Sequence, residues 1–100
     1  MIGYKLFRKR KDGSYGPLFI NRKLRIEPDR WYLMEDHPTK GYAHRPGWHV
    51  CKKPIAPHLK LTKDRVWCVV ECHEFSTIKR PEAQGGEWVL ASDLRIVREW

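Results

Sequence analysis

Four of the five histidines of this 100-residue chain lie in one stretch, residues 36–59. The stretch reads DHPTKGYAHRPGWHVCKKPIAPHL and also holds four of the seven prolines, two glycines, two aromatic residues and four basic residues. Proline and glycine interrupt it too often for one long helix or strand. It therefore predicts a structured loop that runs into a buried strand. Such loops carry binding and catalytic side chains on a rigid scaffold, and we expect the functional site here.

The side chains of this loop suit an anionic or nucleotide-like ligand. Arginine and lysine donate charge-assisted hydrogen bonds to phosphate oxygens, and aromatic rings offer faces on which a base can stack. Gly41 and Gly47 would let the backbone approach a ligand closely. With one arginine contributed by the N-terminal strand, the predicted ligand-binding residues are Arg8, His37, Lys40, Tyr42, Arg45, Trp48 and His49.

Metal binding and thiol catalysis are two other chemistries that histidine and cysteine support. His49 and Cys51 could chelate together, with His37, His44 or His58 as further ligands. The chain has no CxxC or HExxH motif, however, and structural zinc sites use tight, paired ligand spacings. We therefore predict no metal site. A nucleophilic Cys51 would need His49 as its base, and nothing else in the sequence supports that pair.

The charge balance points to an anionic partner. Twenty Lys and Arg against twelve Asp and Glu give a net charge of +8, which suits a nucleic acid, a nucleotide or an acidic protein face. Residues 8–25 are rich in basic side chains and contain one acidic residue, Asp12. This block predicts either a solvated hairpin rim that prevents edge aggregation or an electrostatic footprint for phosphates.

Nucleic-acid binding is a further alternative, because aromatic residues are interleaved with Lys and Arg. Stacking platforms on basic sheets have this composition, although aromatic residues on strands also build cores. No helix-turn-helix, RRM or KH signature is present. The aromatic residues concerned are Tyr4, Phe7, Tyr15, Phe19, Trp48 and Trp67.

Cysteine content and hydropathy indicate the compartment. Three cysteines, an odd number, argue against a disulfide framework and favour a reducing compartment. The N-terminus has no apolar signal-peptide core, and no apolar run approaches the ~20 residues of a membrane span. We expect a cytoplasmic protein without a membrane partner.

The elements that must position these side chains are mainly strands. Alternating apolar residues predict strands at 2–8, 17–20, 31–34, 48–51, 65–72, 87–91 and 94–97, and a short extended segment at 24–26. Turn-forming residues predict a hairpin turn at Asp12-Gly13, a loop at 80–86 and a turn at Ser92-Asp93. One helical turn is expected at 54–59. The 65–72 strand is apolar on both faces for most of its length and should be central. We expect a single domain over 1–100, of the α+β class: a small, strongly curved antiparallel sheet of five to seven short strands with little helix.

Across nearly its whole length the chain resembles a family of short phage-encoded proteins. The resemblance is carried by the segment HPTKGYAHRPGWH, together with YKLFR, GPLFINR, APHL and the closing WVLA and LRIV. It implies a phage or prophage origin and therefore a bacterial host cell.

The layout also resembles that of ADP-ribosyltransferase-like folds. YKLFR at 4–8, GWHVC at 47–51 and EWVL at 87–90 correspond to the three motif strands of those folds. The resemblance implies that Arg8 holds a phosphate or ribose of NAD or ADP-ribose. It also makes His49 and Glu87 catalytic candidates, with His49 against the nicotinamide ribose and Glu87 on the ribose 2′-hydroxyl. The chain departs from the family in being shorter and in lacking the helix between the first two motifs.

We expect binding rather than catalysis: a basic phage protein that takes an anionic or nucleotide-like ligand through the 36–51 loop, to counter a host process. Three alternatives stay open. They are an inhibitor that docks its basic face on an acidic host protein, an ADP-ribosyltransferase-like enzyme that uses NAD, and a nucleic-acid-binding protein. The oligomeric state is left open, because several strands could lie at a sheet edge.

Overall fold

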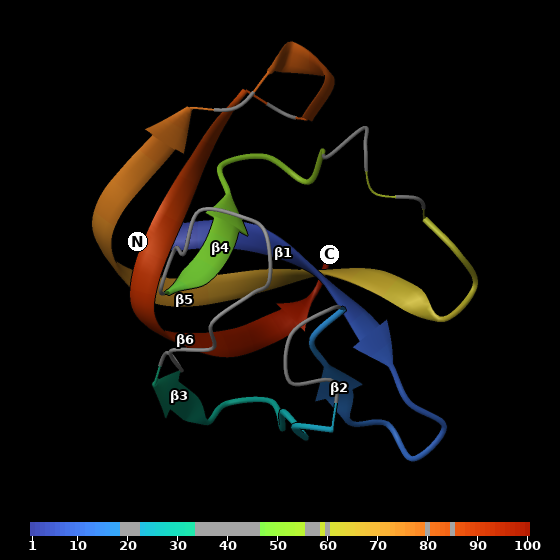
Figure 1. Cartoon of the computed structure of the whole chain (residues 1–100). Helices are drawn as coiled ribbons and strands as arrows, with labels where there is room; N and C mark the ends of the chain where they lie inside the picture. The colour runs from blue at the N-terminus through green and yellow to red at the C-terminus, as the bar shows by residue number, and fades with distance from the viewer. Residues whose placement is uncertain (19–22, 34–46, 56–58, 60, 80, 85) are drawn as a thin grey trace.

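The described residues form one six-stranded sheet of antiparallel pairs (Figure 1). The computed structural model describes residues 1–18, 23–33, 47–55, 59, 61–79, 81–84 and 86–100. The elements are β1 (Ile2–Lys9), β2 (Tyr15–Gly16), β3 (Trp31–Leu33), β4 (Trp48–Cys51), β5 (Arg65–Lys79), the 3₁₀ turn η1 (Glu82–Gln84) and β6 (Glu87–Glu99).

The predicted α+β class is wrong, and the class is β-rich. Among the described residues the helical structure consists of the three residues of η1, which is far too short to cross a membrane. Strand structure dominates because β-branched and aromatic residues alternate along the chain. Six strands fall within the predicted number, but β5 and β6 are 15 and 13 residues long rather than short.

Four of the strands close into a ring. β1 pairs with β5, β5 with β6, β6 with β4, and β4 returns to β1. The last pairing is narrow, since Tyr4 opposite Cys51 is its single registered pair. β2 and β3 extend the sheet from β1 and β6. This closure leaves an interior that small side chains and rings must fill.

The long β5–β6 hairpin curves because its register shifts. Irregularities occur between Val69 and Val70, between His73 and Glu74, and between Glu74 and Ser76. Each extra residue on one strand bends that strand and increases its twist. The bends allow each of the two long strands to pair with further strands. β5 pairs with β1 through its first half, and β6 pairs with β4 and then with β3.

The predicted turn at Ser92-Asp93 is wrong, because β6 continues through both residues. Their side chains are satisfied by the irregular part of β5 instead. The Asp93 carboxylate accepts a hydrogen bond from the backbone N–H of His73 at 3.1 Å and lies 2.7 Å from its ring Nδ1. The Ser92 hydroxyl donates to the His73 carbonyl oxygen at 3.4 Å. Residues that favour turns in isolation thus hold a strand at a bend.

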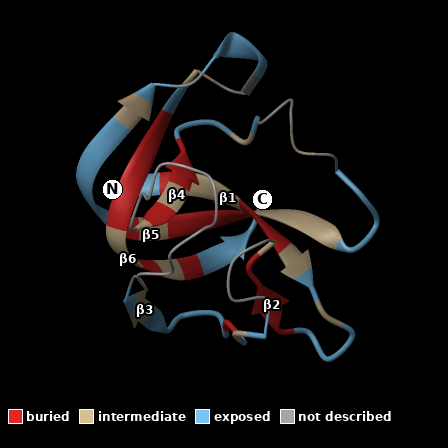
Figure 2. Ribbon diagram, in the orientation of Figure 1, coloured by how far each residue is buried: buried red, intermediate tan, exposed pale blue. Residues whose placement is uncertain are grey.

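The core fills the ring, and Figure 2 shows burial concentrated where β1, β4, β5 and β6 meet. Alternation in WHVC predicts Trp48 and Val50 on one face of β4 and His49 and Cys51 on the other. This is confirmed, because Trp48 and Val50 point inward, whereas Cys51 belongs to a second cluster on the outer face. The central position of β5 is also confirmed. The inner cluster consists of Phe7, Tyr15, Ile26, Trp48, Val50, Cys68, Val70, Cys72, Val89, Ala91, Leu94 and Ile96.

Two other predicted elements differ or fall partly outside the described residues. The return strand of the first hairpin is β2 at Tyr15–Gly16 rather than 17–20, of which residues 19–20 are not described. The helical turn predicted at 54–59 includes the undescribed residues 56–58. Ile26 joins Tyr15 by an isolated bridge with backbone hydrogen bonds of 2.9 and 2.8 Å. This bridge fastens the 23–30 segment to β2.

Because β1 and β4 approach closely where they pair, a methyl group at Gly3 should destabilise the fold. A Cβ at this position would lie 2.4 Å from Val50 Cγ1 and 3.1 Å from the Cys51 carbonyl oxygen. We expect Gly3→Ala to reduce the free energy of unfolding by about 1–3 kcal/mol through overpacking, measured by urea denaturation. In a Val50→Ala background the same change should cost less, because the clashing methyl is gone. Strictly additive effects would contradict this account of the β1–β4 contact.

Candidate functional site

The structure places the predicted loop residues in two groups. His37, Lys40, Tyr42 and Arg45 lie outside the described residues. Trp48, by contrast, is buried in the inner cluster, and its indole Nε1–H donates to the Tyr32 carbonyl oxygen at 3.1 Å. Its ring therefore supports the core and connects β4 to β3, rather than offering an open stacking face.

His49 is half-buried on the outer face of β4. Its ring and the Trp88 ring meet edge to face, at a centroid distance of 6.3 Å and an interplanar angle of 70°. Its backbone carbonyl accepts a hydrogen bond from the Lys5 amine at 2.7 Å. His49 is thus held in place by β1 and β6.

The residues matched to the ADP-ribosyltransferase layout are not brought together. Arg8 pairs with Arg65, the first residue of β5, whereas Glu87 pairs with Lys79, the last residue of β5. Glu87 is exposed and forms an ion pair with Lys52. That contact lowers the pKa of the Glu87 carboxyl and raises the pKa of the Lys52 amine. A site that uses Arg8 and Glu87 on one ribose would need them at the same end of the sheet.

The structure does bring Arg8 together with Arg10, which follows β1 in the first hairpin. Both guanidinium groups lie against Gly16 of β2: a Cβ there would be 2.7 Å from Arg10 Nη2 and 3.4 Å from Arg8 Nη2. Both side chains are half-buried. A larger residue at this position would displace the Arg10 guanidinium, so the absence of a side chain at Gly16 lets both arginines lie against β2.

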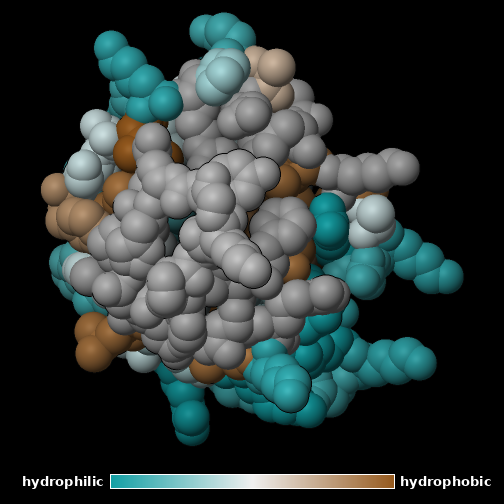
Figure 3. Space-filling view, viewed as in Figure 1, coloured by the Kyte–Doolittle hydropathy of each residue, from teal (hydrophilic) through white to brown (hydrophobic). Residues whose placement is uncertain are grey.

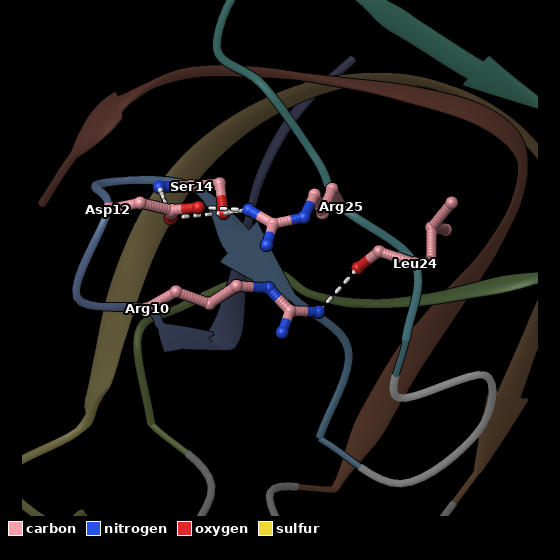
Figure 4. Close-up of polar contacts among 5 residues, drawn as sticks. All are labelled: Arg10, Asp12, Ser14, Leu24 and Arg25. Atoms are coloured by element: carbon pink, nitrogen blue, oxygen red, sulfur yellow. Dashed lines mark hydrogen bonds and ion pairs between the residues drawn. The ribbon is translucent and has the colours of Figure 1, made fainter.

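Arg10 also joins the hairpin to the next segment, as Figure 4 shows. Its Nη2 donates to the Leu24 carbonyl oxygen at 2.8 Å. Nearby, the Asp12 carboxylate accepts from the Ser14 N–H at 3.0 Å and the Ser14 hydroxyl at 2.7 Å, and it pairs with Arg25. These contacts, the Ser14 hydroxyl first, lower the pKa of the Asp12 carboxyl. The hairpin tip is thus an ordered surface.

More basic residues adjoin this pair and form what we call the basic end. The basic end comprises Arg8, Lys9, Arg10, Lys11, Lys23, Arg25, Lys63 and Arg65. Backbone contacts unite these segments: the Lys9 N–H donates to the Asp64 carbonyl oxygen at 2.7 Å, and Arg8 pairs with both Gly16 and Arg65. Figure 3 shows hydrophilic side chains gathering at the lower right, over the β1–β2 hairpin and the 61–65 segment.

Among the residues that the structure describes, three carboxylates contact the basic end and neutralise it in part. Asp12 pairs with Arg25, and Glu99 pairs with Lys9 at 3.0 Å. The carboxyl of Asp64 has a lowered pKa, first because of the Thr62 hydroxyl and further because of the Arg65 and Arg8 charges. Among the described residues of this surface, basic groups thus outnumber acidic ones by eight to three. An anion approaching this surface is therefore attracted.

The cysteines are placed for packing. All three are free and buried. Burial raises the pKa of the Cys68 thiol to about 12 and also raises the pKa of the Cys72 thiol, which opposes thiolate formation. In the described part of the chain, no group of three or more His, Cys, Asp or Glu side chains is arranged to hold a metal ion.

Sequence reasoning identified Arg8 and the basic hairpin but missed the approach to Gly16 that organises them. Arg10 belongs to the run RKRK beside the Asp12-Gly13 turn, which was a usable signal. Gly16 and Arg65 had no local signal, because their approach to Arg8 depends on the register of β1 with two other strands.

Comparison of the chain with protein-family models, with curated proteins and with solved structures returned no match. The function must therefore be argued from the residues themselves.

Proposed function

We propose that this protein binds a phosphate-bearing ligand at its basic end, with Arg8 and Arg10 as the central contacts. The observation that carries the proposal is the approach of two half-buried guanidinium groups to the side-chain-free surface of Gly16. Two positive charges held close together raise the local positive electrostatic potential. A phosphate can accept charge-assisted, bidentate hydrogen bonds from such groups.

The surroundings support an extended phosphate-bearing ligand. The basic end continues from the hairpin to the 61–65 segment and to Lys23 and Arg25, so successive phosphates could each meet a cation. Nucleic acids carry phosphates at regular intervals, and a nucleotide carries them at one end. Both sources share the same chemistry, and binding measurements distinguish them.

The test measures affinity for labelled single-stranded RNA, single-stranded DNA, duplex DNA, ATP and ADP-ribose by fluorescence anisotropy or calorimetry. We expect Arg8→Gln combined with Arg10→Gln to weaken binding by about tenfold or more, since each charged hydrogen bond contributes about 1.5–3 kcal/mol. For DNA, the slope of log affinity against log salt should also become shallower by about 2, one for each phosphate that the variant no longer neutralises.

Lys53→Gln combined with Lys79→Gln is the matched control. It removes the same two charges from the end of the sheet where Lys79 pairs with Glu87, and it should leave affinity within about twofold at moderate salt because distant exposed charges are screened. Thermal unfolding of both double variants distinguishes a binding defect from a folding defect. Arg10→Lys keeps the charge but removes the forked geometry, so it should weaken binding less than Arg10→Gln.

Three results would overturn the proposal. One is equal loss of affinity in the control pair and in the arginine pair. Another is equal affinity for poly-glutamate and for nucleic acid, which would indicate general attraction to carboxylates and favour an acidic protein as partner. Absence of binding to every phosphate compound at low salt would exclude the site as well.

The same binding assay also tests the loop that the sequence predicts as the ligand site. Arg45→Ala and His49→Ala test whether the 36–51 loop contributes to the ligand site. Loss of nucleotide affinity in these variants, with the arginine pair intact, would assign the anionic ligand to the loop instead of the basic end.

A further inference from the structure

The outer face of β1 carries aromatic and apolar side chains next to the basic end. Successive residues of a strand point to opposite faces, and Phe7 points into the inner cluster. Tyr4, Leu6 and Arg8 therefore share the outer face. Because Arg8 belongs to the basic end, this face continues directly from the proposed phosphate site.

Strand pairing extends the outer face from β1 across β5 to the end of β6. Residues opposite one another in a sheet share a face, and Arg8 lies opposite Arg65 of β5. Two residues further along β5, the Trp67 carbonyl oxygen accepts a hydrogen bond from the N–H of Trp100 at 2.8 Å. Trp67 also packs against the cluster on the outer face. A row of two arginines is thus followed by a row that holds two tryptophans.

Trp100 presents its ring to solvent on this face. The residue is 64% exposed. Its ring meets that of Tyr4 edge to face, at a centroid distance of 6.5 Å and an interplanar angle of 85°. Tyr4 and Trp67 are half-buried. The Trp100 indole is therefore held by neighbours on two strands, while much of its surface remains within reach of a ligand.

We propose that the ligand of the basic end is a single-stranded nucleic acid, one of whose bases stacks on Trp100, beside Tyr4, while its phosphates meet Arg8 and Arg65. This inference rests on the proposed function and extends it from the phosphates to the bases. Residues two apart on a strand are separated by about 7 Å. A nucleotide bridges such a separation between its phosphate and its base.

Charge and ring type together favour this ligand. Single-stranded nucleic acids bind basic surfaces that carry aromatic side chains, because every base has a face for stacking. Duplex DNA keeps its base faces inside the helix. The row beyond the tryptophans ends in a further cation, since Tyr4 lies opposite Val69 and Val69 lies opposite Arg98. Positive charge therefore flanks the rings on both sides, as a chain with several phosphates requires.

The test separates the contribution of the bases from that of the phosphates. Fluorescence anisotropy at constant salt compares oligo-dT with an abasic oligomer of the same length and charge. We expect oligo-dT to bind the wild-type protein about fivefold more tightly or more, the effect of one base–aromatic contact. Trp100→Leu should remove this difference and leave the affinity for the abasic oligomer unchanged. Arg8→Gln combined with Arg10→Gln should weaken the binding of both oligomers alike.

Trp31→Leu is the matched control, because it removes a tryptophan that is 45% exposed on β3. Trp31 lies beside Arg95, whose charge is paired with Asp29 and Glu71. Carboxylates repel phosphate, so this variant should bind both oligomers as the wild-type protein does. Trp100→Phe keeps an aromatic ring and should retain part of the preference for oligo-dT. Thermal unfolding of every variant verifies that the fold is intact.

The inference is overturned if the wild-type protein binds the two oligomers equally, or if Trp31→Leu and Trp100→Leu lose the same affinity. Weakening of duplex DNA by Trp100→Leu as strong as that of oligo-dT would also contradict it, because paired bases do not reach the ring. Each of these results is compatible with dependence on Arg8 and Arg10, and the phosphate site would then stand alone. Dependence on Trp100 without dependence on these arginines would overturn the proposed function instead.

Discussion

Phe7→Ala should reduce the free energy of unfolding by about 3–5 kcal/mol, the range for removal of a buried phenylalanine ring. Phe7 is 0% exposed at the centre of the ring of strands. Its ring contacts Tyr15 edge to face at a centroid distance of 6.3 Å. With a total stability of about 5–15 kcal/mol expected for a domain, the variant should be close to unfolding. The thermal midpoint should fall by about 15–30 °C.

Phe75→Ala provides the matched control, because it removes the same side chain from the irregular part of β5. Phe75 is 50% exposed, and its ring covers Gly47 rather than entering the inner cluster. We expect a loss of about 1 kcal/mol, in line with partial burial. Chemical denaturation of both variants under the same conditions gives the comparison. Equal losses at positions 7 and 75 would mean that the ring of strands does not enclose the main core.

Local pattern predicted much of the sheet. The alternation in Ile2–Lys9, Trp48–Cys51 and the first half of β5 is strong, and each forms a strand. In β1, however, the residue that enters the inner cluster is Phe7, and the alternating apolar residues Ile2, Tyr4 and Leu6 do not. The second half of β5 is mostly exposed, so its sequence carries no apolar signal. It is a strand because its backbone pairs with β6, a long-range condition that no short window contains.

The closure of the sheet into a ring could not be predicted from local sequence pattern either. One registered pair, Tyr4 with Cys51, joins β1 to β4, and the curvature that permits it comes from register shifts near Val70 and Glu74. Bulges depend on how two strands meet, so composition alone does not place them.

Sequence reasoning found the part of the candidate site that is a continuous basic segment, and it missed the contacts made between distant strands. Arg8 was identified from the basic hairpin. The role of its neighbour Gly16 became visible only in the structure, where two guanidinium groups lie against it. Lys5 carries no signal of its own in the sequence, since lysine is normally exposed. The position of its amine depends on β4, which is over forty residues away in sequence.

The burial of Lys5 predicts a pH dependence of stability with a definite sign. The pKa of its amine is about 8 in the folded protein and should be near 10.4 when unfolded. Between these values the unfolded chain binds more protons than the folded one, so the Lys5 contribution to stability rises with pH. Below pH 8 both states are protonated, and the full cost of burying the charged amine persists.

Lys5→Met isolates this contribution because methionine keeps an unbranched side chain without a charge. From about pH 8 to 10.5, wild-type stability should increase relative to the variant by about 2–3 kcal/mol, the equivalent of the pKa difference. The raised pKa values of Tyr15 and Cys68 act in the opposite direction at alkaline pH, but they are common to both proteins and cancel.

Urea denaturation at several pH values measures this difference, and Lys53→Met gives the baseline for an exposed lysine. A difference that stays flat through pH 8–10.5 would show that the Lys5 amine is solvated in the folded state. A difference that rises with pH would identify Lys5 as a buried cation whose hydrogen bond to the His49 carbonyl oxygen joins β1 to β4.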